Sequence, residues 1–372
     1  MVRFVLIGLA APVLLACAGL ETVSSTPADR EAESTEITAA TDQRIAAINQ
    51  EFVFADIHAH PSRFHRANVP SISDEEIDLY LSRRMDLVVA NISSDMAYTG
   101  SYTNADGTKV EKGQYKPAPG ETFALAMNRL QRAMRSFESG KAVHAANPAA
   151  VLAARKAGKL AIMPALEGAD ALEGSIENLR TMHAAGLRLI QLVHFRANEL
   201  GHIQTFPYSP GGLTEFGREV VREANRLGMV IDLAHCNTET IMDVLALSED
   251  PVVFSHGGLK ALLEQDRALT DAEVRAIAEK GGVIGIWPHG RHVPTVSRMV
   301  DHFDHIIKLV GPEHAAIGSD LRGVSRYSEG FSDEAEFRAI AAELLKRGRS
   351  DESVGKIMGG NFFALWQAID AN

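Results

Sequence analysis

The sequence predicts an α/β fold, namely an eight-stranded parallel β/α barrel of the TIM type with a C-terminal helical extension. The first observation is a series of eight short apolar runs, each continuous rather than alternating, which is typical of parallel strands buried on both faces. The second is that amphipathic helix patterns lie between the runs, as a β/α barrel requires. An open doubly wound sheet would place a glycine-rich phosphate loop after an early strand, and the sequence has none.

The expected strands are short and begin with the run FVFADI. They occupy residues 52–57, 85–92, 160–166, 187–193, 229–234, 251–255, 282–287 and 315–319. One expected helix has Thr214 as its N-cap and Gly228 just past its end, and another starts in a turn led by Asp271 and stops at Gly281. Further helix patterns cover residues 121–139, 171–185, 238–248 and 297–310. Residues 332–372 are expected to form the helices that close the barrel.

Two connections are long and carry no helix pattern, residues 93–120 and 195–213. Loops of this length in a compact domain usually cover a binding or catalytic site. We therefore expect both connections to lie near the functional face of the barrel.

The N-terminal segment indicates export and lipidation. The stretch MVRFVLIGLAAPVLLACAGL has one early arginine and an apolar run that is too short for a spanning helix, which predicts a signal peptide over residues 1–16. Its LLAC ending resembles a bacterial lipoprotein processing site, at which Cys17 becomes the lipidated first residue; an ordinary secretory signal with a chance cysteine is the alternative. Residues 17–50 are then the lipidated cysteine and a flexible polar tether, and residues 51–372 are the barrel domain.

These features predict a place for the protein in the cell. Ala18 after the cysteine favours the bacterial cell envelope, at the periplasmic face of the outer membrane, with the lipid anchor holding the chain to the membrane.

The net charge of −11 argues against a nucleic-acid partner, because phosphate binding needs clustered lysine and arginine. With only two cysteines in the chain, a disulfide framework does not stabilise the fold.

The carboxyl ends of the expected strands carry an unusual set of side chains. In a β/α barrel these ends converge on one face. They hold five imidazoles and two carboxylates: His58, His60, Glu167, His194, His235, His256 and Asp320. The spacing of His58 and His60 puts both rings on the same side of an extended segment, so that both can bind one cation.

This donor set predicts a metal centre. A single histidine at a strand end is more often a core residue than a ligand, but a series at successive strand ends is difficult to explain in that way. Neutral imidazole suits Zn²⁺, and a carboxylate can bridge two ions, so six donors are enough for two zinc ions that share a water molecule. Such a pair generates hydroxide near neutral pH and polarises a carbonyl or phosphoryl oxygen. The other histidines are expected at the surface: His65, His144, His183, His202, His289, His292, His302, His305 and His314.

The segments VIDLAHCN, PVVFSHGG, DRALTD, AAIGSDLRGV and KIMGGN resemble those of the membrane (renal) dipeptidases, zinc peptidases of the amidohydrolase superfamily, and the likeness spans about residues 52–370. The resemblance implies that His58, His60, Glu167 and Asp320 serve one zinc, while the bridging Glu167 with His235 and His256 holds the other. It implies that Asp320 accepts a proton from the bridging water and that His194 contacts the substrate and stabilises the oxyanion. Arg267 would pair with the terminal carboxylate of the substrate, a role suited to a guanidinium.

The sequence departs from the family pattern at two positions. The family usually has HxD on the first strand, whereas this chain has His60 in the sequence HAH, which removes one negative charge from the ligand set. Arg322 in GSDLRG stands where a more acidic residue is common in the family. Metal preference, water pKa and substrate range are the properties that these changes would alter.

The sequence therefore predicts a metallo-dipeptidase that hydrolyses small dipeptide-like amides with a free C-terminal carboxylate through a binuclear, metal-bridged hydroxide. Other superfamily hydrolases that act on lactones or phosphoesters typically have a carboxylated lysine on strand four, and no lysine occupies a strand end here. A deaminase with a single metal ion would also use strand-end histidines, and a lipoprotein that binds a ligand without catalysis could keep the same residues. A homodimer is a possible assembly, because relatives often dimerise.

Overall fold

The computed structural model describes residues 27–66, 68–95, 102–103, 109–110, 117–205, 210–332 and 334–371. The chain divides into two compact units, Met1–Thr41 and Asp42–Asn372, and the second of these is the barrel. The expected signal peptide over residues 1–16 and the expected lipidation site Cys17 lie outside the described residues. In the part of the chain that is described, no helix combines the length and the apolar character needed to cross a bilayer.

The predicted barrel is confirmed, and its eight strands follow one another in the sheet in the order of the sequence. They are β1 (Ala55–Ala59), β2 (Leu87–Ser93), β6 (Leu160–Glu167), β7 (Leu189–Gln191), β8 (Val230–Asp232), β9 (Val253–Phe254), β12 (Val283–Ile286) and β13 (Ala315–Ile317). All neighbouring pairs are parallel. The seam between β13 and β1 is narrow: the backbone N–H of Asp320 donates to the carbonyl of His58, and that of His60 donates to the carbonyl of Leu321, both at 2.8 Å. The barrel is therefore nearly closed.

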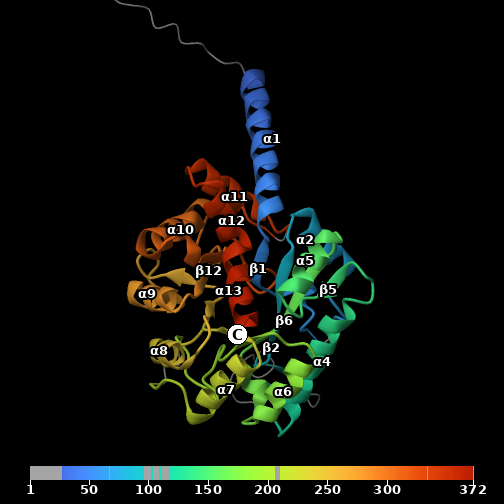
Figure 1. Cartoon of the computed structure of the whole chain (residues 1–372), viewed down its shortest axis with the longest axis vertical. Coiled ribbons are helices and arrows are strands. Elements are labelled where there is room, and N and C mark those ends of the chain that lie inside the picture. The colour runs from blue at the N-terminus through green and yellow to red at the C-terminus, as the bar shows by residue number, and fades with distance from the viewer. Residues whose placement is uncertain are drawn as a thin grey trace, which may run out of the picture. The chain divides into compact units, whose positions relative to one another are not determined.

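Helices surround this sheet (Figure 1). They are α2 (Asp74–Ser82), α4 (Glu121–Arg135), α5 (Pro148–Lys156), α6 (Ile176–Ala184), α7 (Glu215–Arg226), α8 (Thr238–Leu247), α9 (Asp271–Glu279), α10 (Val296–Val310), α11 (Phe337–Lys346), α12 (Asp351–Gly355) and α13 (Asn361–Asp370). The predicted N-cap Thr214 accepts a hydrogen bond from the N–H of Gly217, and Thr270 forms a capping box with Glu273 at the start of α9.

Several small elements complete the chain. A short strand, β5 (Ala142–His144), pairs with β6 at the edge of the barrel sheet. Two further two-stranded pairs are β3 (Tyr102–Thr103) with β4 (Lys109–Val110), and β10 (Gly258–Leu259) with β11 (Ala268–Leu269). Short 3₁₀-helical turns are η1 (Pro61–Arg63), η2 (Ala169–Leu172) and η3 (Pro312–His314), and η4 (Lys356–Gly360) is a π-helical turn. The β3–β4 pair lies inside the long connection 93–120, which otherwise shows no helix among its described residues.

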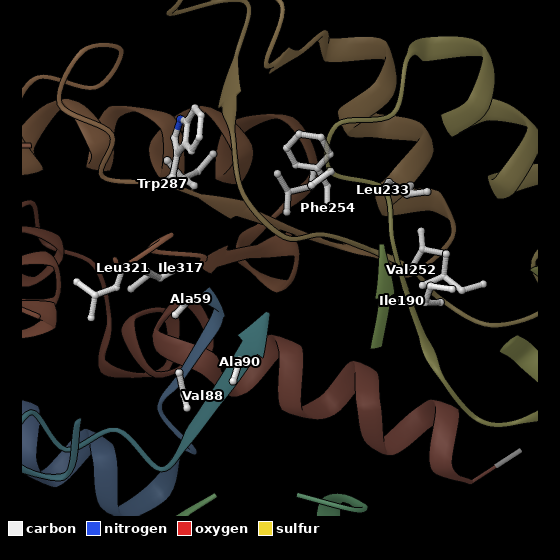
Figure 2. Close-up of a cluster of buried hydrophobic side chains, with 14 of the residues drawn as sticks. Ala59, Val88, Ala90, Ile190, Leu233, Val252, Phe254, Trp287, Ile317 and Leu321 are labelled. Atoms are coloured by element: carbon white, nitrogen blue, oxygen red, sulfur yellow. The ribbon is translucent and has the colours of Figure 1, made fainter. Parts of the chain in front are cut away.

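The strands are buried on both faces, and each face packs in a separate apolar cluster. In β6, Ala161, Met163 and Ala165 belong to the cluster that also contains Phe362 and Trp366 of α13. The alternate residues of the same strand belong to the larger cluster between the sheet and the helices, part of which Figure 2 shows. Because α13 shares a cluster with the inward face of the strands, it closes one end of the barrel, and the carboxyl ends of the strands remain open for a functional site.

The structure differs from the expected tether over the last part of residues 17–50. Helix α1 covers Pro27–Glu51, and within the barrel unit its side chains Ile45 and Ile48 are buried in the larger apolar cluster. The amide of Asn49 also donates to the buried carboxylate of Asp86 at 2.9 Å. The folded unit thus begins at Asp42 rather than at residue 51. The spacing of Ile45 and Ile48, three residues apart, is the helical pattern that the polar composition of the segment obscured.

Candidate metal centre

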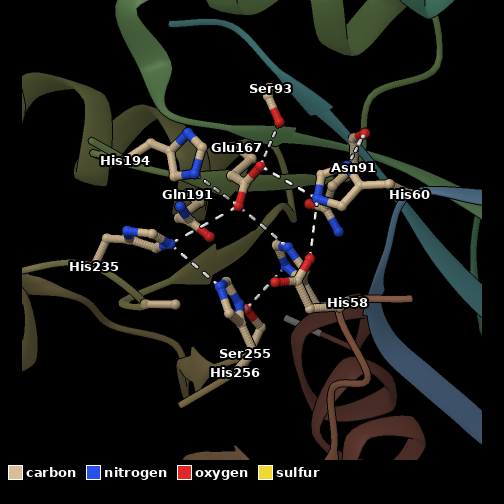
Figure 3. Close-up of polar contacts among 12 residues, drawn as sticks. His58, His60, Asn91, Ser93, Glu167, Gln191, His194, His235, Ser255 and His256 are labelled. Atoms are coloured by element: carbon tan, nitrogen blue, oxygen red, sulfur yellow. Dashed lines mark hydrogen bonds and ion pairs between the residues drawn. The ribbon is translucent and has the colours of Figure 1, made fainter. Parts of the chain in front are cut away.

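The seven side chains that the sequence placed at strand ends lie together at one mouth of the barrel, and Figure 3 labels all of them except Asp320. Glu167 is the last residue of β6, and His58 lies near the end of β1. The others follow their strands by one to three residues: His60, His194, His235, His256 and Asp320. All seven are buried, from 0% exposed for His58 to 8% for Asp320. The convergence expected for the carboxyl ends of barrel strands therefore brings these residues to one place.

Two of these residues have a strained backbone. His235 has φ of +70° and Asp320 has φ of +49°, a left-handed conformation that residues other than glycine adopt rarely. In both cases the chain leaves a strand and turns within three residues. Such strain persists only where the surrounding structure imposes it, and it is frequent at functional sites.

Glu167 occupies the centre of the cluster. Its Oε1 lies 3.3 Å from Nε2 of His58, 3.2 Å from Nε2 of His194 and 3.9 Å from Nε2 of His235. Its Oε2 lies 3.4 Å from Nε2 of His60 and accepts a hydrogen bond from the hydroxyl of Ser93. Glu167 thus adjoins four of the five imidazoles of the cluster through its two oxygens.

Two groups of residues offer ligand atoms that all lie within 4.8 Å of one another: His58, His60 and Glu167 in the first, and Glu167, His235 and His256 in the second. Asp320 adjoins the first group, with Oδ1 at 3.4 Å from Nε2 of His60. Within the described chain, Nε2 of His58 and Oδ1 of Asp320 are buried without a hydrogen-bond partner. An imidazole nitrogen and a carboxylate oxygen left unsatisfied in this way fit a divalent cation.

A layer of polar groups orients the imidazoles from outside. The hydroxyl of Ser255 lies 3.2 Å from Nδ1 of His58 and 2.9 Å from Nδ1 of His256. The carbonyl of Asn91 lies 3.2 Å from Nδ1 of His60. These contacts occupy the Nδ1 atoms, so the Nε2 atoms face the centre, as outer partners of metal-binding histidines commonly arrange. Sequence reasoning missed Ser93, Ser255 and Asn91, whose residue types carry no metal-ligand signal.

His194 is held by a carboxylate that the sequence did not single out. Nδ1 of His194 lies 2.6 Å from Oδ1 of Asp95, and Oδ2 of Asp95 accepts a hydrogen bond from the N–H of Phe195 at 2.9 Å. Burial disfavours the charged imidazole, but Asp95 and Glu167 outweigh it and raise the pKa of His194 to about 9. Asp95 lies in the connection 93–120, and the loop's predicted place near the site was the only available signal.

The metal centre opens into a cavity of about 330 Å³. Arg267 lines this cavity and is only 8% exposed. Its Nε donates to Oε1 of Gln204 at 2.9 Å, its Nη2 donates to the carbonyl of His256 at 3.1 Å, and its guanidinium lies 5.0 Å from the ring centre of Trp287. Burial lowers the pKa of Arg267 to about 10, so the group remains charged near neutral pH. The structure thus places the predicted carboxylate-binding residue at the cavity.

Two of the histidines expected at the surface are buried instead. His65 is 8% exposed and lines the cavity, with its ring centre 4.8 Å from that of His60. His302 is 3% exposed and its Nδ1 accepts a hydrogen bond from the N–H of Leu259 at 3.2 Å. His302 faces inward from α10, because it lies three residues after Met299 and four residues before Ile306 and so falls on the apolar stripe of the helix. The other expected surface histidines are all partly exposed.

The known sequences that resemble this chain are those of dipeptidases. The sequence profile of the membrane dipeptidases (peptidase family M19) matches residues 42–372. The dipeptidase verJ of Clonostachys rogersoniana is 34% identical over 221 residues, which cover 58% of this chain and 57% of the relative. The dipeptidase tcpJ of Claviceps purpurea is 33% identical over 223 residues, which cover 58% of this chain and 52% of the relative. The match thus spans little more than half the length of these relatives.

Comparison with solved structures supports the fold. The probable dipeptidase PvdM from Pseudomonas aeruginosa superposes with a TM-score of 0.76 at 21% identity, covering 91% of this chain and 99% of that one. A metallopeptidase from Rhodobacter sphaeroides, solved with a phosphinate mimic of the dipeptide L-Ala-D-Ala, gives a TM-score of 0.70 at 22% identity, covering 85% and 99%. Since the family profile covers the whole barrel unit and the barrel brings the expected ligands together, this chain belongs to the membrane dipeptidase family, peptidase family M19.

Proposed function

We propose that this protein is a metal-dependent dipeptidase that hydrolyses small dipeptide-like amides with a free C-terminal carboxylate. The observation that carries the proposal is that Glu167 belongs to both groups of buried ligand atoms, with His58 and His60 in one and with His235 and His256 in the other, beside a cavity of dipeptide size. Membership of the M19 family and the dipeptidase relatives support the same reaction class. The phosphinate dipeptide mimic bound by the Rhodobacter sphaeroides metallopeptidase supports the substrate class.

The donor set fits two zinc ions, one held by His58, His60, Glu167 and Asp320 and the other by Glu167, His235 and His256. When bound, such a pair lowers the pKa of water and polarises a carbonyl oxygen. His60 in place of the usual aspartate leaves Glu167 and Asp320 as the two carboxylates of the set. Two ions are therefore neutralised less completely here than in a centre with three carboxylates, which favours the ionised form of a water molecule held among these residues.

The remaining residues supply positioning and proton transfer. Asp320 has two carboxylate oxygens, so one can serve as a metal ligand while the other accepts the proton of the attacking water and delivers it to the leaving amine. Nε2 of His194 faces Glu167 and can donate to the oxyanion that develops on the substrate carbonyl, an effect worth about 3 kcal/mol per donor. Arg267 offers its guanidinium to the terminal carboxylate, which fixes the substrate with its amide bond over the metal centre.

The proposal is tested with purified protein loaded with zinc and assayed on a panel of dipeptides with L or D second residues. We expect hydrolysis that a chelator abolishes and that zinc restores, with about two zinc ions per chain. Glu167→Gln removes the shared charge and should reduce bound zinc and lower kcat/KM by about a thousandfold or more. Glu173→Gln, a change of the same type in the turn before α6, is the matched control.

Three results would contradict the proposal. The first is hydrolysis of dipeptides that survives complete removal of metal. The second is a preference for lactones or phosphotriesters over every dipeptide in the panel. The third is full dipeptidase activity in Glu167→Gln, because this variant lacks the charge on which the shared ligand depends.

We further propose that the chain is a lipoprotein of the bacterial cell envelope, at the periplasmic face of the outer membrane, anchored through Cys17. The LLAC sequence at the end of the apolar N-terminal run supports this assignment. Expression of the full chain in a Gram-negative host should place it in the membrane fraction, and Cys17→Ser should release it or leave it unprocessed. Recovery of the unchanged protein in the soluble fraction would contradict the anchor.

A further inference from the structure

We propose that two buried aspartates, Asp56 and Asp232, are positioning residues of the metal centre, each of which fixes the serine that directly precedes a metal ligand. The inference rests on the proposed zinc centre but not on the substrate, so it goes beyond the proposed reaction. Asp56 lies on β1 and Asp232 on β8, and both are 0% exposed. Neither is among the described residues that line the cavity, so their carboxylates act through neighbouring residues rather than on a bound dipeptide.

The first pair, Asp56 with Ser319, joins the two strands at the seam of the barrel. Asp56 lies on β1 two residues before His58. Ser319 follows β13 and directly precedes Asp320. Oδ1 of Asp56 accepts a hydrogen bond from the N–H of Ser319 at 2.9 Å, and its Oδ2 accepts one from the Ser319 hydroxyl at 2.5 Å. The same hydroxyl oxygen accepts from the N–H of Leu321 at 3.0 Å. The residues on both sides of Asp320 are thus fixed to the strand that carries His58.

The second pair, Asp232 with Ser255, joins β8 and β9 in the same way. Asp232 is the last residue of β8 and lies three residues before His235. Ser255 directly follows β9 and directly precedes His256. Oδ1 of Asp232 accepts hydrogen bonds from the N–H groups of Ala234 and Ser255, both at 2.9 Å. Asp232 therefore fixes the backbone of the serine whose hydroxyl contacts Nδ1 of two imidazoles.

Both pairs stand at the point where regular strand pairing stops. β9 ends at Phe254 and β13 ends at Ile317, and the N–H of the serine beyond each end binds a carboxylate instead of a carbonyl of the neighbouring strand. A buried N–H without an acceptor costs about as much as a lost hydrogen bond, so each carboxylate extends the pairing to the residue before a ligand. A carboxylate buried at 0% exposure is itself costly, and such a departure from an apolar barrel wall is expected where it serves a site.

The two pairs serve the two proposed ions differently. The Asp56–Ser319 pair holds Asp320 beside the strand of His58, and these two ligands belong to the same ion. The hydroxyl of Ser255 touches His58 of that ion and His256 of the other. Loss of the first pair should therefore weaken the binding of one ion, whereas loss of the second should weaken the binding of both.

The test measures zinc binding by the purified full chain, in competition with a chromophoric chelator. We expect Asp56→Ala to weaken one of two zinc ions by about 10- to 100-fold and to leave the other unchanged, and Asp232→Ala to weaken both ions by about the same factor. Asp232→Asn keeps an oxygen acceptor for both N–H groups, so it should bind zinc with an affinity close to that of the wild type. Cobalt(II) in place of zinc adds a visible spectrum that responds to the geometry of the ligands.

Asp86→Ala is the matched control. Asp86 is also a buried aspartate that accepts a hydrogen bond from the N–H of a neighbouring segment, that of Phe54 at 2.9 Å, but it precedes β2 at the opposite end of the barrel. Like the other alanine variants, it should lower the free energy of unfolding measured in urea with a chelator present. Its zinc affinity and cobalt spectrum should match those of the wild type. If an alanine variant of the pairs does not fold, Ser319→Ala and Ser255→Ala remove only the hydroxyls and should give the same pattern of one ion weakened and both ions weakened.

Wild-type zinc affinities and cobalt spectra in Asp56→Ala and Asp232→Ala would overturn the inference, because the two aspartates would then serve only the fold. An equal loss of zinc affinity in Asp86→Ala would also overturn it, because the effect would then follow from any loss of a buried aspartate. None of these measurements needs turnover. A chain that shows the expected zinc pattern but hydrolyses no dipeptide would support the inference and contradict the proposed function alone.

Discussion

At the scale of single residues, the site depends on groups that orient the ligands as much as on the ligands themselves. Asp95 is fully buried and holds both Nδ1 of His194 and the N–H of Phe195. One carboxylate thus fixes the ring of His194 and the direction in which the chain leaves β7. Because Asp95 is not among the described residues that line the cavity, it acts through His194 rather than on the substrate.

This role predicts that Asp95→Ala lowers kcat by about 10- to 100-fold while KM changes little. The variant leaves Nδ1 of His194 and the N–H of Phe195 without a partner, which should also cost about 1–3 kcal/mol of unfolding free energy. Asp95→Asn keeps an acceptor oxygen, so it should lower kcat and the free energy of unfolding by smaller amounts. Steady-state kinetics and urea unfolding measure the two effects, and an unchanged kcat in Asp95→Ala would contradict the positioning role.

The limits of sequence reasoning are visible at this scale. The candidate ligands could be predicted because histidine, glutamate or aspartate directly after an apolar run is chemically conspicuous at the mouth of a barrel. Asp95, Ser93 and Ser255 could not, because serine carries no metal-ligand signal and Asp95 is separated from the apolar run by two serines, in a segment typical of an ordinary turn. Their roles depend on distances between segments far apart in the chain, such as the 74 positions between Ser93 and Glu167.

At the scale of elements, the strands approach one another so closely that side chains are excluded at certain positions. A Cβ atom added to Gly285 in β12 would collide with the carbonyl oxygen of Ser255, which follows β9. The hydroxyl of the same serine orients His58 and His256. Strand packing and metal-site geometry are therefore coupled through Ser255.

Gly285→Ala should consequently damage both stability and metal binding. We expect a loss of about 3 kcal/mol from overpacking and about a tenfold weaker affinity for zinc from displacement of Ser255. Gly228→Ala is the control, because that glycine has φ of +65° but no atom within 4 Å of an added Cβ. It should cost about 1 kcal/mol and leave zinc affinity unchanged. Thermal unfolding measures the loss of stability, and zinc titration measures the loss of affinity. Equal zinc affinities in the two variants would contradict the coupling.

The element boundaries show which signals are local and which are not. The helix over residues 121–139 was predicted from its own pattern and ends at Arg135. By contrast, α5 and β5 were not predicted, because elements of nine and three residues are too short to give a clear periodic signal. The polar composition of the last turns of α1 indicates a tether, whereas the hydrogen bond from Asn49 to Asp86, which fixes them to the barrel, depends on a residue far along the chain.

At the scale of the whole molecule, the barrel buries titratable groups that do not take part in the chemistry. His302 is the clearest case: burial between α10 and β10, with Arg298 nearby, lowers its pKa from 6.5 to about 4. The folded protein therefore binds fewer protons at this group than the unfolded chain between pH 4 and 6.5. The free energy of unfolding that depends on a neutral His302 is therefore fully present above pH 6.5 and is lost as the pH falls toward 4.

Full protonation of His302 lowers the free energy of unfolding by an amount on the order of 3 kcal/mol. His302→Asn keeps an acceptor for the N–H of Leu259 but removes the titration, so its unfolding free energy should fall less steeply than that of the wild type between pH 6.5 and 4. Urea unfolding at several pH values, with a chelator present so that zinc binding does not contribute, measures the difference. His305, on the same helix but paired with Asp271 and partly exposed, supplies the control variant His305→Asn. Parallel pH profiles for wild type and His302→Asn would show that the acid sensitivity of the barrel arises from other buried groups.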